Sequence, residues 1–162
     1  MADRIAILDK GEIMQVSTPA EIYEAPTSRF IANFVGNVNM FEGKVKKRTK
    51  EGVEITGGTG AVIDVHNAGD AETGKDVAFA IRPEKIKVSS KKPPASAGNA
   101  MQGEIFDIAY LGDMTVYHVK LDDGQVVKTA TLNAARVTDD PLSWGDKAWI
   151  SFSPDAGVVL TR

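Results

Sequence analysis

Residues 115–124 read TVYHVKLDDG and carry the clearest structural signal in the chain. Thr115, Tyr117, Val119 and Leu121 alternate with other residues, and this period of two is typical of a half-buried β-strand. The Asp-Asp-Gly that follows is a turn sequence, because Gly adopts the positive φ that a tight hairpin turn requires. The stretch therefore predicts a strand and the start of its hairpin.

The same alternation recurs through the chain from about residue 40. Val53 and Ile55 belong to one short alternating segment, and Val77, Phe79 and Ile81 belong to another. Turn sequences rich in glycine and aspartate separate such segments. Short strands divided by turns predict a mainly β fold, either a small barrel or a sandwich. No repeat period is evident in the sequence.

One low-complexity stretch interrupts the predicted strands. Residues 89–99 read SSKKPPASAGN, with adjacent prolines and no large apolar side chain to bury. Such a composition is typical of a linker. We therefore expect a flexible loop over residues 89–102.

The N-terminal part of the chain predicts a β-hairpin and a first short helix. Residues 5–16 place two apolar segments on either side of an Asp-Lys-Gly turn, which favours a hairpin. Thr18, Pro19 and Glu21 then follow in the order of a capping box, with the hydroxyl at the N-cap, proline at N1 and the carboxylate at N3. The helix is expected to end before Pro26.

A second helix is predicted with Thr27 as its N-cap and Gly36 as its left-handed C-terminal residue. Residues 1–36 are too few to build a core of their own. We therefore expect one apolar face of this helix to pack against the β domain, residues 37–162, or against a second copy of the chain. That association face consists of Phe30, Ile31, Phe34 and Val35.

The composition is that of a globular protein and excludes several functional classes. The 162 residues are 43% hydrophobic and 25% charged, with a net charge of −3. This charge gives no bulk attraction to nucleic acid or anionic lipid. The absence of cysteine excludes disulfides, thiol nucleophiles and cysteine-built zinc sites. The opening apolar run, residues 5–8, is too short for direct membrane insertion.

Residues 69–76 match a phosphate-binding loop at every position but the last. That position requires Ser or Thr to bind magnesium and a helix beginning there, whereas Asp76 is followed by a strand-like segment. His66 and His118 are far apart and have no carboxylate at helical spacing, which favours structural roles. We predict no catalytic, cofactor-binding or metal-binding residue and no enzymatic activity of this chain alone.

A dense cationic run lies between residues 44 and 50. On an alternating strand Lys44, Lys46, Arg48 and Lys50 would share a face, which could follow a phosphate backbone. Only Phe41 is near enough to stack on a base, and lysine is common on solvated edge strands. Nucleic-acid binding therefore stays a minor alternative.

Arg82, Pro83 and Glu84 follow a predicted strand and end it abruptly. Pro83 has no N–H for the ladder and favours an extended Arg82, so the three residues should form a fixed corner. The structural interpretation is a strand terminator with a surface ion pair between Arg82 and Glu84. The functional interpretation is an interface or ligand corner.

Several segments together resemble a known family. Residues 1–8 (MADRIAIL), 10–13 (KGEI) and 18–23 (TPAEIY) resemble the end of the ATPase domain of ABC transporters. Residues 34–39 (FVGNVN) resemble the family's junction between ATPase and regulatory domains, which places Gly36 and Asn39 at the domain boundary.

The second half of the chain extends this resemblance. Residues 80–84 (AIRPE) resemble the signature of the OB-type regulatory domain called TOBE, found in importer ATPases. Residues 110–112 (YLG) and 145–152 (GDKAWISF) are most similar to the spermidine/putrescine branch. The fold implied is an OB-like TOBE barrel over residues 37–162, after an ATPase-domain remnant over residues 1–36.

The resemblance also implies a function. Such a domain regulates and dimerises the ATP-hydrolysing subunit of an ABC importer, here one for polyamines, with Arg82, Pro83 and Glu84 as an interface or regulatory corner. The family's ATP-binding motifs lie upstream of the segment that resembles residues 1–4, so we expect a C-terminal fragment. ATP and magnesium would be cofactors of the parent subunit only.

The partners implied are a second copy of the subunit and the transporter's membrane subunits, at the cytoplasmic face of the cell membrane. Two alternatives stay open from the residues themselves. One is a β-barrel that binds a small ligand, either an oxyanion or a polyamine. The other is an OB-type nucleic-acid binder, suggested by the cationic run.

Overall fold

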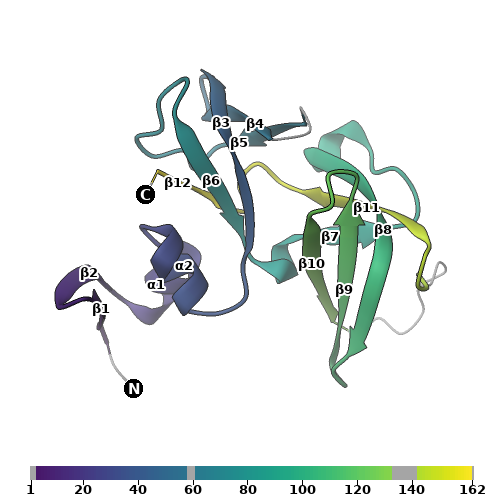
Figure 1. Cartoon of the computed structure of the whole chain (residues 1–162), viewed down its shortest axis with the longest axis horizontal. Helices are drawn as coiled ribbons and strands as arrows, with labels where there is room; N and C mark the ends of the chain where they lie inside the picture. The colour runs from purple at the N-terminus through teal and green to yellow at the C-terminus, as the bar shows by residue number, and fades with distance from the viewer. Residues whose placement is uncertain (1–2, 58–60, 133–141, 162) are drawn as a thin grey trace.

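The computed structural model describes residues 3–57, 61–132 and 142–161. Within these residues a hairpin and two short helices precede two curled, five-stranded antiparallel sheets (Figure 1). The prediction of a mainly β fold preceded by a hairpin and two helices is therefore confirmed. The N-terminal elements are β1 (Ile5–Asp9), β2 (Glu12–Ser17), α1 (Pro19–Glu24) and α2 (Arg29–Phe34).

The two sheets have the same arrangement of strands. Each sheet also contains one short edge strand from the part of the sequence that forms the other sheet. The first sheet runs β12-β6-β3-β4-β5 and the second runs β10-β9-β8-β11-β7. The first comprises β3 (Asn39–Arg48), β4 (Val53–Gly57), β5 (Val62–Val65), β6 (Asp76–Ile81) and β12 (Val158–Leu160). The second comprises β7 (Lys87–Ser89), β8 (Asn99–Tyr110), β9 (Met114–Leu121), β10 (Val126–Leu132) and β11 (Lys147–Phe152). Two short 3-10 helices, η1 (Pro83–Lys85) and η2 (Ala95–Ala97), flank β7.

The start of α1 agrees with the capping-box prediction, and the start of α2 does not agree with its predicted cap. The Glu21 amide donates to Thr18 Oγ1 at 3.2 Å, and the Thr18 amide donates to Glu21 Oε2 at 3.1 Å. In α2 the N-cap is Ser28, whose hydroxyl accepts from the Ile31 amide at 3.3 Å. Thr27 instead donates to the Gln15 side chain, so its predicted capping role is wrong.

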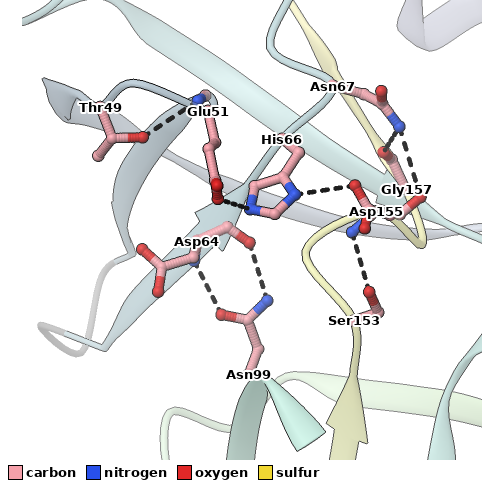
Figure 2. A network of polar contacts seen from close by, with 10 residues as sticks. Thr49, Glu51, Asp64, His66, Asn67, Asn99, Ser153, Asp155 and Gly157 are labelled. Atoms are coloured by element: carbon pink, nitrogen blue, oxygen red, sulfur yellow. Dashed lines mark hydrogen bonds and ion pairs between the residues drawn. The ribbon is translucent and has the colours of Figure 1, made fainter. Parts of the chain in front are cut away.

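The predicted loop over residues 89–102 is too long at its C-terminal end. Asn99 already begins β8 and is buried. Its side chain forms two hydrogen bonds with the backbone of Asp64, at 2.8 and 2.9 Å, and so joins the two sheets (Figure 2). Residues 90–98 connect β7 to β8 through η2, and their flexibility stays a prediction.

The two sheets repeat one arrangement of strands, a structural duplication, although no repeat period is evident in the sequence. Asn39 and Gly43 stand in β3 where Asn99 and Gly103 stand in β8. The Asn39 side chain forms two hydrogen bonds with the backbone of Lys128 in β10, at 2.8 and 2.9 Å, as Asn99 does with β5. Each half thus carries one asparagine that binds the other half.

Backbone details repeat between the halves as well. A Cβ added to Gly43 would lie 2.6 Å from the Thr56 carbonyl oxygen, and one added to Gly103 would lie 2.6 Å from the Lys120 carbonyl oxygen. The β3–β4 pair has an irregularity between Val45 and Lys47, and the β8–β9 pair has one between Ile105 and Asp107. The repeat escapes detection in the sequence because only a few residues with special backbone roles are shared.

One apolar core lies between the halves. Phe41, Phe79 and Phe152 form its aromatic centre, with ring centroids 5.5 to 6.1 Å apart. All three side chains are buried, and strands of both sheets contribute to the surrounding cluster. The two halves therefore depend on each other for burial.

Replacing Gly43 tests the close strand approach. We expect Gly43→Ala to lower the free energy of unfolding by about 1 to 3 kcal/mol, because the added methyl group overlaps the backbone of β4. Gly57→Ala is the matched control, since a Cβ there meets its nearest atom at 3.9 Å; its effect should stay within about 0.5 kcal/mol. Urea denaturation measures both, and equal losses would contradict the repeat's packing.

Candidate functional site: the junction of the N-terminal segment and the barrel

Arg82 is buried at the end of β6 and its side chain reaches into the N-terminal segment. Only 5% of the residue is exposed. Its Nε and Nη2 donate to the Tyr23 carbonyl oxygen at 3.3 and 3.0 Å, and its Nη1 donates to the carbonyl oxygens of Ala32 and Asn37 at 3.2 and 3.0 Å. The guanidinium also lies 4.2 Å from the centroid of the Tyr23 ring. The predicted surface ion pair with Glu84 is therefore wrong.

Two of the three carbonyl groups that Arg82 binds lie at helix ends, and the third, that of Asn37, lies in the linker to β3. Tyr23 belongs to the last turn of α1 and Ala32 to the last turn of α2. Carbonyls in the last turn have no intrahelical donor, and a cationic side chain there satisfies them and opposes the negative end of the helix dipole. One guanidinium thus donates to free carbonyl groups at the C-termini of both helices and fixes the position of one helix relative to the other.

Pro83 and Glu84 form the corner that the sequence predicts, and the corner faces the N-terminal segment. Pro83 is buried at the start of η1. The Tyr23 hydroxyl donates to Glu84 Oε1. Burial and then the Glu84 carboxylate raise the pKa of Tyr23 to about 12. Whether this corner also serves regulation or subunit contact stays a prediction.

Helix α2 lies on the outer face of the first sheet (Figure 1). Ala32 is fully buried in a small apolar cluster with Ala78, Ala80 and Leu160. These short side chains allow a close approach of helix and sheet. At the edge of the contact Arg29 forms a bidentate ion pair with the Glu42 carboxylate, with distances of 3.1 and 3.0 Å.

The four residues of the predicted association face do not share one environment, so the single face is wrong. Ile31 is fully buried in a cluster with Ile7 and Ile22, and Val35 packs against that cluster. Phe30 and Phe34 point outward, with 39% and 67% of their surface exposed, and their rings stack 5.8 Å apart. The helix is too short for all four positions to face inward, and an association role for the two phenylalanines stays a prediction.

The two halves differ at the positions where the first half contacts α2. Trp149 occupies in β11 the place of Ala78 in β6, because the two residues pair with Gln102 and Glu42 at corresponding positions. A tryptophan prevents the close approach of a helix. Ser153 occupies in the second half the place that Arg82 has in the first. The second half therefore has no cation at this position to bind the carbonyl groups of helix C-termini.

Gly36 and Asn39 lie where the chain passes from α2 into β3. Gly36 has φ +137°, and a Cβ there would lie 3.9 Å from both Arg82 Nη1 and the Tyr23 ring. Sequence reasoning placed these residues at a domain boundary but missed the hydrogen bonds of Asn39 to β10 and the role of Tyr23. The repeated spacing of Asn39 to Gly43 and Asn99 to Gly103 was the available signal.

The cationic run does not form the shared face that alternation predicts. The irregularity near Lys46 changes which side of β3 the following residues occupy. Lys44 pairs with Asp76 at 3.4 Å and Lys47 pairs with Glu54 at 3.1 Å. Arg48 donates to the Ala71 carbonyl oxygen, so three of these cations already have partners.

The remaining catalytic candidates have structural surroundings. β6 begins at Asp76, where a phosphate-binding loop would require a helix. His66 lies between two carboxylates, with Nδ1 2.8 Å from Asp155 Oδ1 and Nε2 3.1 Å from Glu51 Oε2 (Figure 2). These contacts hold the end of β5 against the segment that leads into β12. Within residues 3–57, 61–132 and 142–161, no group of three or more His, Asp or Glu side chains could hold a metal ion.

Comparison with known proteins identifies the family. The family model described as the TOBE domain matches residues 79–160, about half of the chain. The chain belongs to the TOBE domain family. The matched TOBE residues include Arg82, Pro83 and Glu84, and they run from β6 to β12.

Relatives of the TOBE chain include ATP-binding proteins of polyamine transporters. The putrescine transport ATP-binding protein PotG of Escherichia coli is 42% identical over 163 residues, covering 99% of this chain and 43% of that protein. The spermidine/putrescine import ATP-binding protein PotA of Thermotoga maritima is 30% identical, with coverages of 99% and 44%. The resemblance to this branch is confirmed, and the chain spans less than half the length of these relatives.

A solved structure supports the fold. The cytoplasmic molybdate-binding protein ModG, with molybdate bound, superimposes with a TM-score of 0.67 and 16% sequence identity, covering 76% of this chain and 96% of that chain. The OB-like, TOBE-type fold prediction is thereby confirmed. In the part of the TOBE chain that the structure describes, no helix is long and apolar enough to cross a bilayer.

Removing the Arg82 guanidinium should release the N-terminal segment. We expect Arg82→Ala to lower the free energy of unfolding by about 1 to 3 kcal/mol, because three carbonyl groups lose their donor. Amide exchange in residues 19–37 should become faster while β8 and β9 stay protected. Lys85→Ala is the neighbouring control, since its ion pair with Glu24 is long and exposed. Unchanged exchange in Arg82→Ala would refute the capping role.

The raised pKa of Tyr23 predicts a stability loss at alkaline pH. The folded protein keeps the Tyr23 proton to about pH 12, whereas the unfolded chain releases it near 10. The stabilisation is therefore complete below about pH 10 and is lost as the pH rises towards 12. Tyr23→Phe should remove this part of the pH dependence. Urea midpoints across that window measure it, and parallel curves for both proteins would contradict the assignment.

Proposed function

We propose that this chain is the regulatory part of the ATP-binding subunit of an ABC importer for polyamines. Residues 1–36 would be the end of the ATPase domain, and residues 37–162 would be the TOBE regulatory domain. The matches to PotG and PotA extend over 99% of the chain and so include the N-terminal segment as well as the barrel. ATP and magnesium would be bound by the parent subunit.

The observation that carries the proposal is the single buried Arg82 that joins both helices to the barrel. Its acceptors lie in α1, in α2 and in the linker, so the three move with β6 as one body. If the ATPase domain moved, these helices and the barrel would therefore move with it, because no flexible linker would absorb the movement. A regulatory domain requires such a stiff connection.

Exposed apolar side chains on the N-terminal segment fit contact with the rest of an ATPase domain. Leu8, Ile13 and Phe34 are each more than half exposed, and they lie outside the contact with the barrel. Large exposed apolar side chains gathered on one segment are typical of interaction surfaces. The proposed partner of this surface is the preceding part of the same subunit.

The proposed partners of the whole subunit are a second copy and the importer's membrane subunits, at the cytoplasmic face of the membrane. Two ATPase domains that separated completely between turnovers would lose association entropy each time. A regulatory domain that keeps the two copies together raises their effective concentration. Nucleic-acid binding is not favoured, because three cations of the 44–50 run already have partners in the chain.

Coupling in the complete transporter tests the proposal. We expect Arg82→Lys in the full-length subunit to lower transport-stimulated ATP hydrolysis several-fold relative to basal hydrolysis, because a lysine cannot reproduce the planar fork. Lys50→Gln, a charge change away from the junction, is the control. Reconstituted transporter in lipid vesicles gives both rates. An unaltered ratio of stimulated to basal hydrolysis would overturn the proposed coupling role.

A further inference from the structure

His66 lies between two carboxylates that come from different parts of the barrel. Its Nδ1 is 2.8 Å from Asp155 Oδ1, and its Nε2 is 3.1 Å from Glu51 Oε2 (Figure 2). Glu51 belongs to the turn between β3 and β4, Asp155 belongs to the turn between β11 and β12, and His66 directly follows β5. One imidazole ring therefore joins three segments of the chain.

The two contacts fix the protonation state of the ring. An ionised carboxylate can only accept a hydrogen bond, whereas a neutral imidazole has one nitrogen that donates and one that accepts. Both carboxylates are therefore bound only by the imidazolium, in which both nitrogens donate. In the neutral ring one nitrogen presents its lone pair to a carboxylate oxygen, so that contact is lost.

The charged groups around the ring are the two carboxylates themselves. Among the described residues no lysine or arginine forms an ion pair with Glu51 or Asp155. The Asp64 carboxylate, on the same strand as the ring, points away from it (Figure 2). On the neighbouring strand β4, Glu54 is paired with Lys47 at 3.1 Å. The two contacts therefore depend on the proton of the ring and on the two carboxylates.

The ring holds the turn that leads into β12, together with backbone bonds that do not titrate. The His66 amide donates to the Pro154 carbonyl oxygen at 3.0 Å, and the Val159 amide donates to the Asn67 carbonyl oxygen at 3.1 Å. β12 has three residues, lies at the edge of the first sheet and pairs with β6. The stability of a strand this short depends on the contacts of its flanking turn. The proton of the ring therefore adjusts the stability of β12 without abolishing the strand.

β12 connects this turn to the N-terminal segment. Leu160 of β12 is buried in the apolar cluster that also contains Ala32 of α2. Gly157, just before the strand, borders the same small hollow as Tyr23 and Arg82. A change in the contacts of the ring therefore reaches the surface on which α2 lies.

We propose that His66 is a pH-sensitive latch on β12. Histidine ordinarily changes its charge between about pH 5 and 8. At the acidic end of this range the imidazolium binds both carboxylates and holds β12 and α2; at the alkaline end one carboxylate is released and both elements loosen. The stability that the latch adds is thus complete at low pH and is lost as the pH rises. The latch stands on the contacts of His66, whereas its effect on subunit coupling rests on the proposed function.

Nuclear magnetic resonance on this chain tests the latch at about pH 5.5 and about pH 8. We expect both ring nitrogens of His66 to carry a proton at the lower pH and only one of them at the higher pH. Exchange protection of β12 and of residues 29–34, corrected for the pH dependence of intrinsic exchange, should fall by about 2- to 5-fold over this range, because the ion pairs are exposed. β9 should keep its protection.

Variants separate the latch from a general effect of pH. His66→Gln should remove the pH dependence of β12, and so should Asp155→Asn, because an asparagine amide can donate to a neutral ring. Asp155 is exposed, so its variant keeps the test valid even if His66→Gln disturbs β5. His118→Gln is the matched control, since it removes the other histidine of the chain, in β9, and should leave the dependence unchanged.

Three results would overturn the latch. They are a His66 ring with one proton at the lower pH, equal protection of β12 at both pH values, and a pH dependence that His118→Gln removes as completely as His66→Gln. These measurements need no ATPase domain, so their failure would leave the coupling role of Arg82 intact.

Discussion

A buried guanidinium bound only to neutral groups is the constraint on which the arrangement of this chain depends. The guanidinium of Arg82 is a cation with five N–H donors, and folding removes it from contact with water. The cost of removing that charge from water must be offset by donors and acceptors at fixed places. Three carbonyl groups and the Tyr23 ring supply this compensation. If the helices left the barrel, the cation would exchange these bonds and the Tyr23 ring for water, and the carbonyl groups would lose their donor.

The two halves of the barrel have the same arrangement of strands but carry different residues at a few corresponding positions. The halves share the asparagines that join them and the glycines that allow close strand approach. They differ at Ala78 and Trp149, and at Arg82 and Ser153, which occupy corresponding places. The first half has the small residues and the cation that hold the helices. The second half has Trp149 and Ser153 in their place. These few positions therefore distinguish the half that holds the N-terminal segment from the half that does not.

Local features of this structure could be predicted from the sequence, and contacts between distant residues could not. The capping box at Thr18 and the hairpin after Leu121 depend on neighbouring residues, so their patterns suffice. The predicted loop before β8 is too long because the Asn99 side chain is hydrogen-bonded to the backbone of Asp64, a residue of the other half. Arg82 appeared as a surface residue because its three acceptors lie 45 to 59 positions earlier in the chain. Backbone carbonyls leave no signature in a sequence.

The positions of Arg82 and Glu42 give the N-terminal helices two attachments of different strength. Arg82 is buried and its bonds are shielded from water, whereas 64% of the Glu42 side chain is exposed. An exposed ion pair contributes little stability and exchanges readily with other cations. The buried attachment therefore holds the segment on the barrel, while the exposed one adds little. The position of α2 on the barrel is therefore determined by the Arg82 bonds and by the small apolar cluster around Ala32, and not by the exposed Arg29–Glu42 pair.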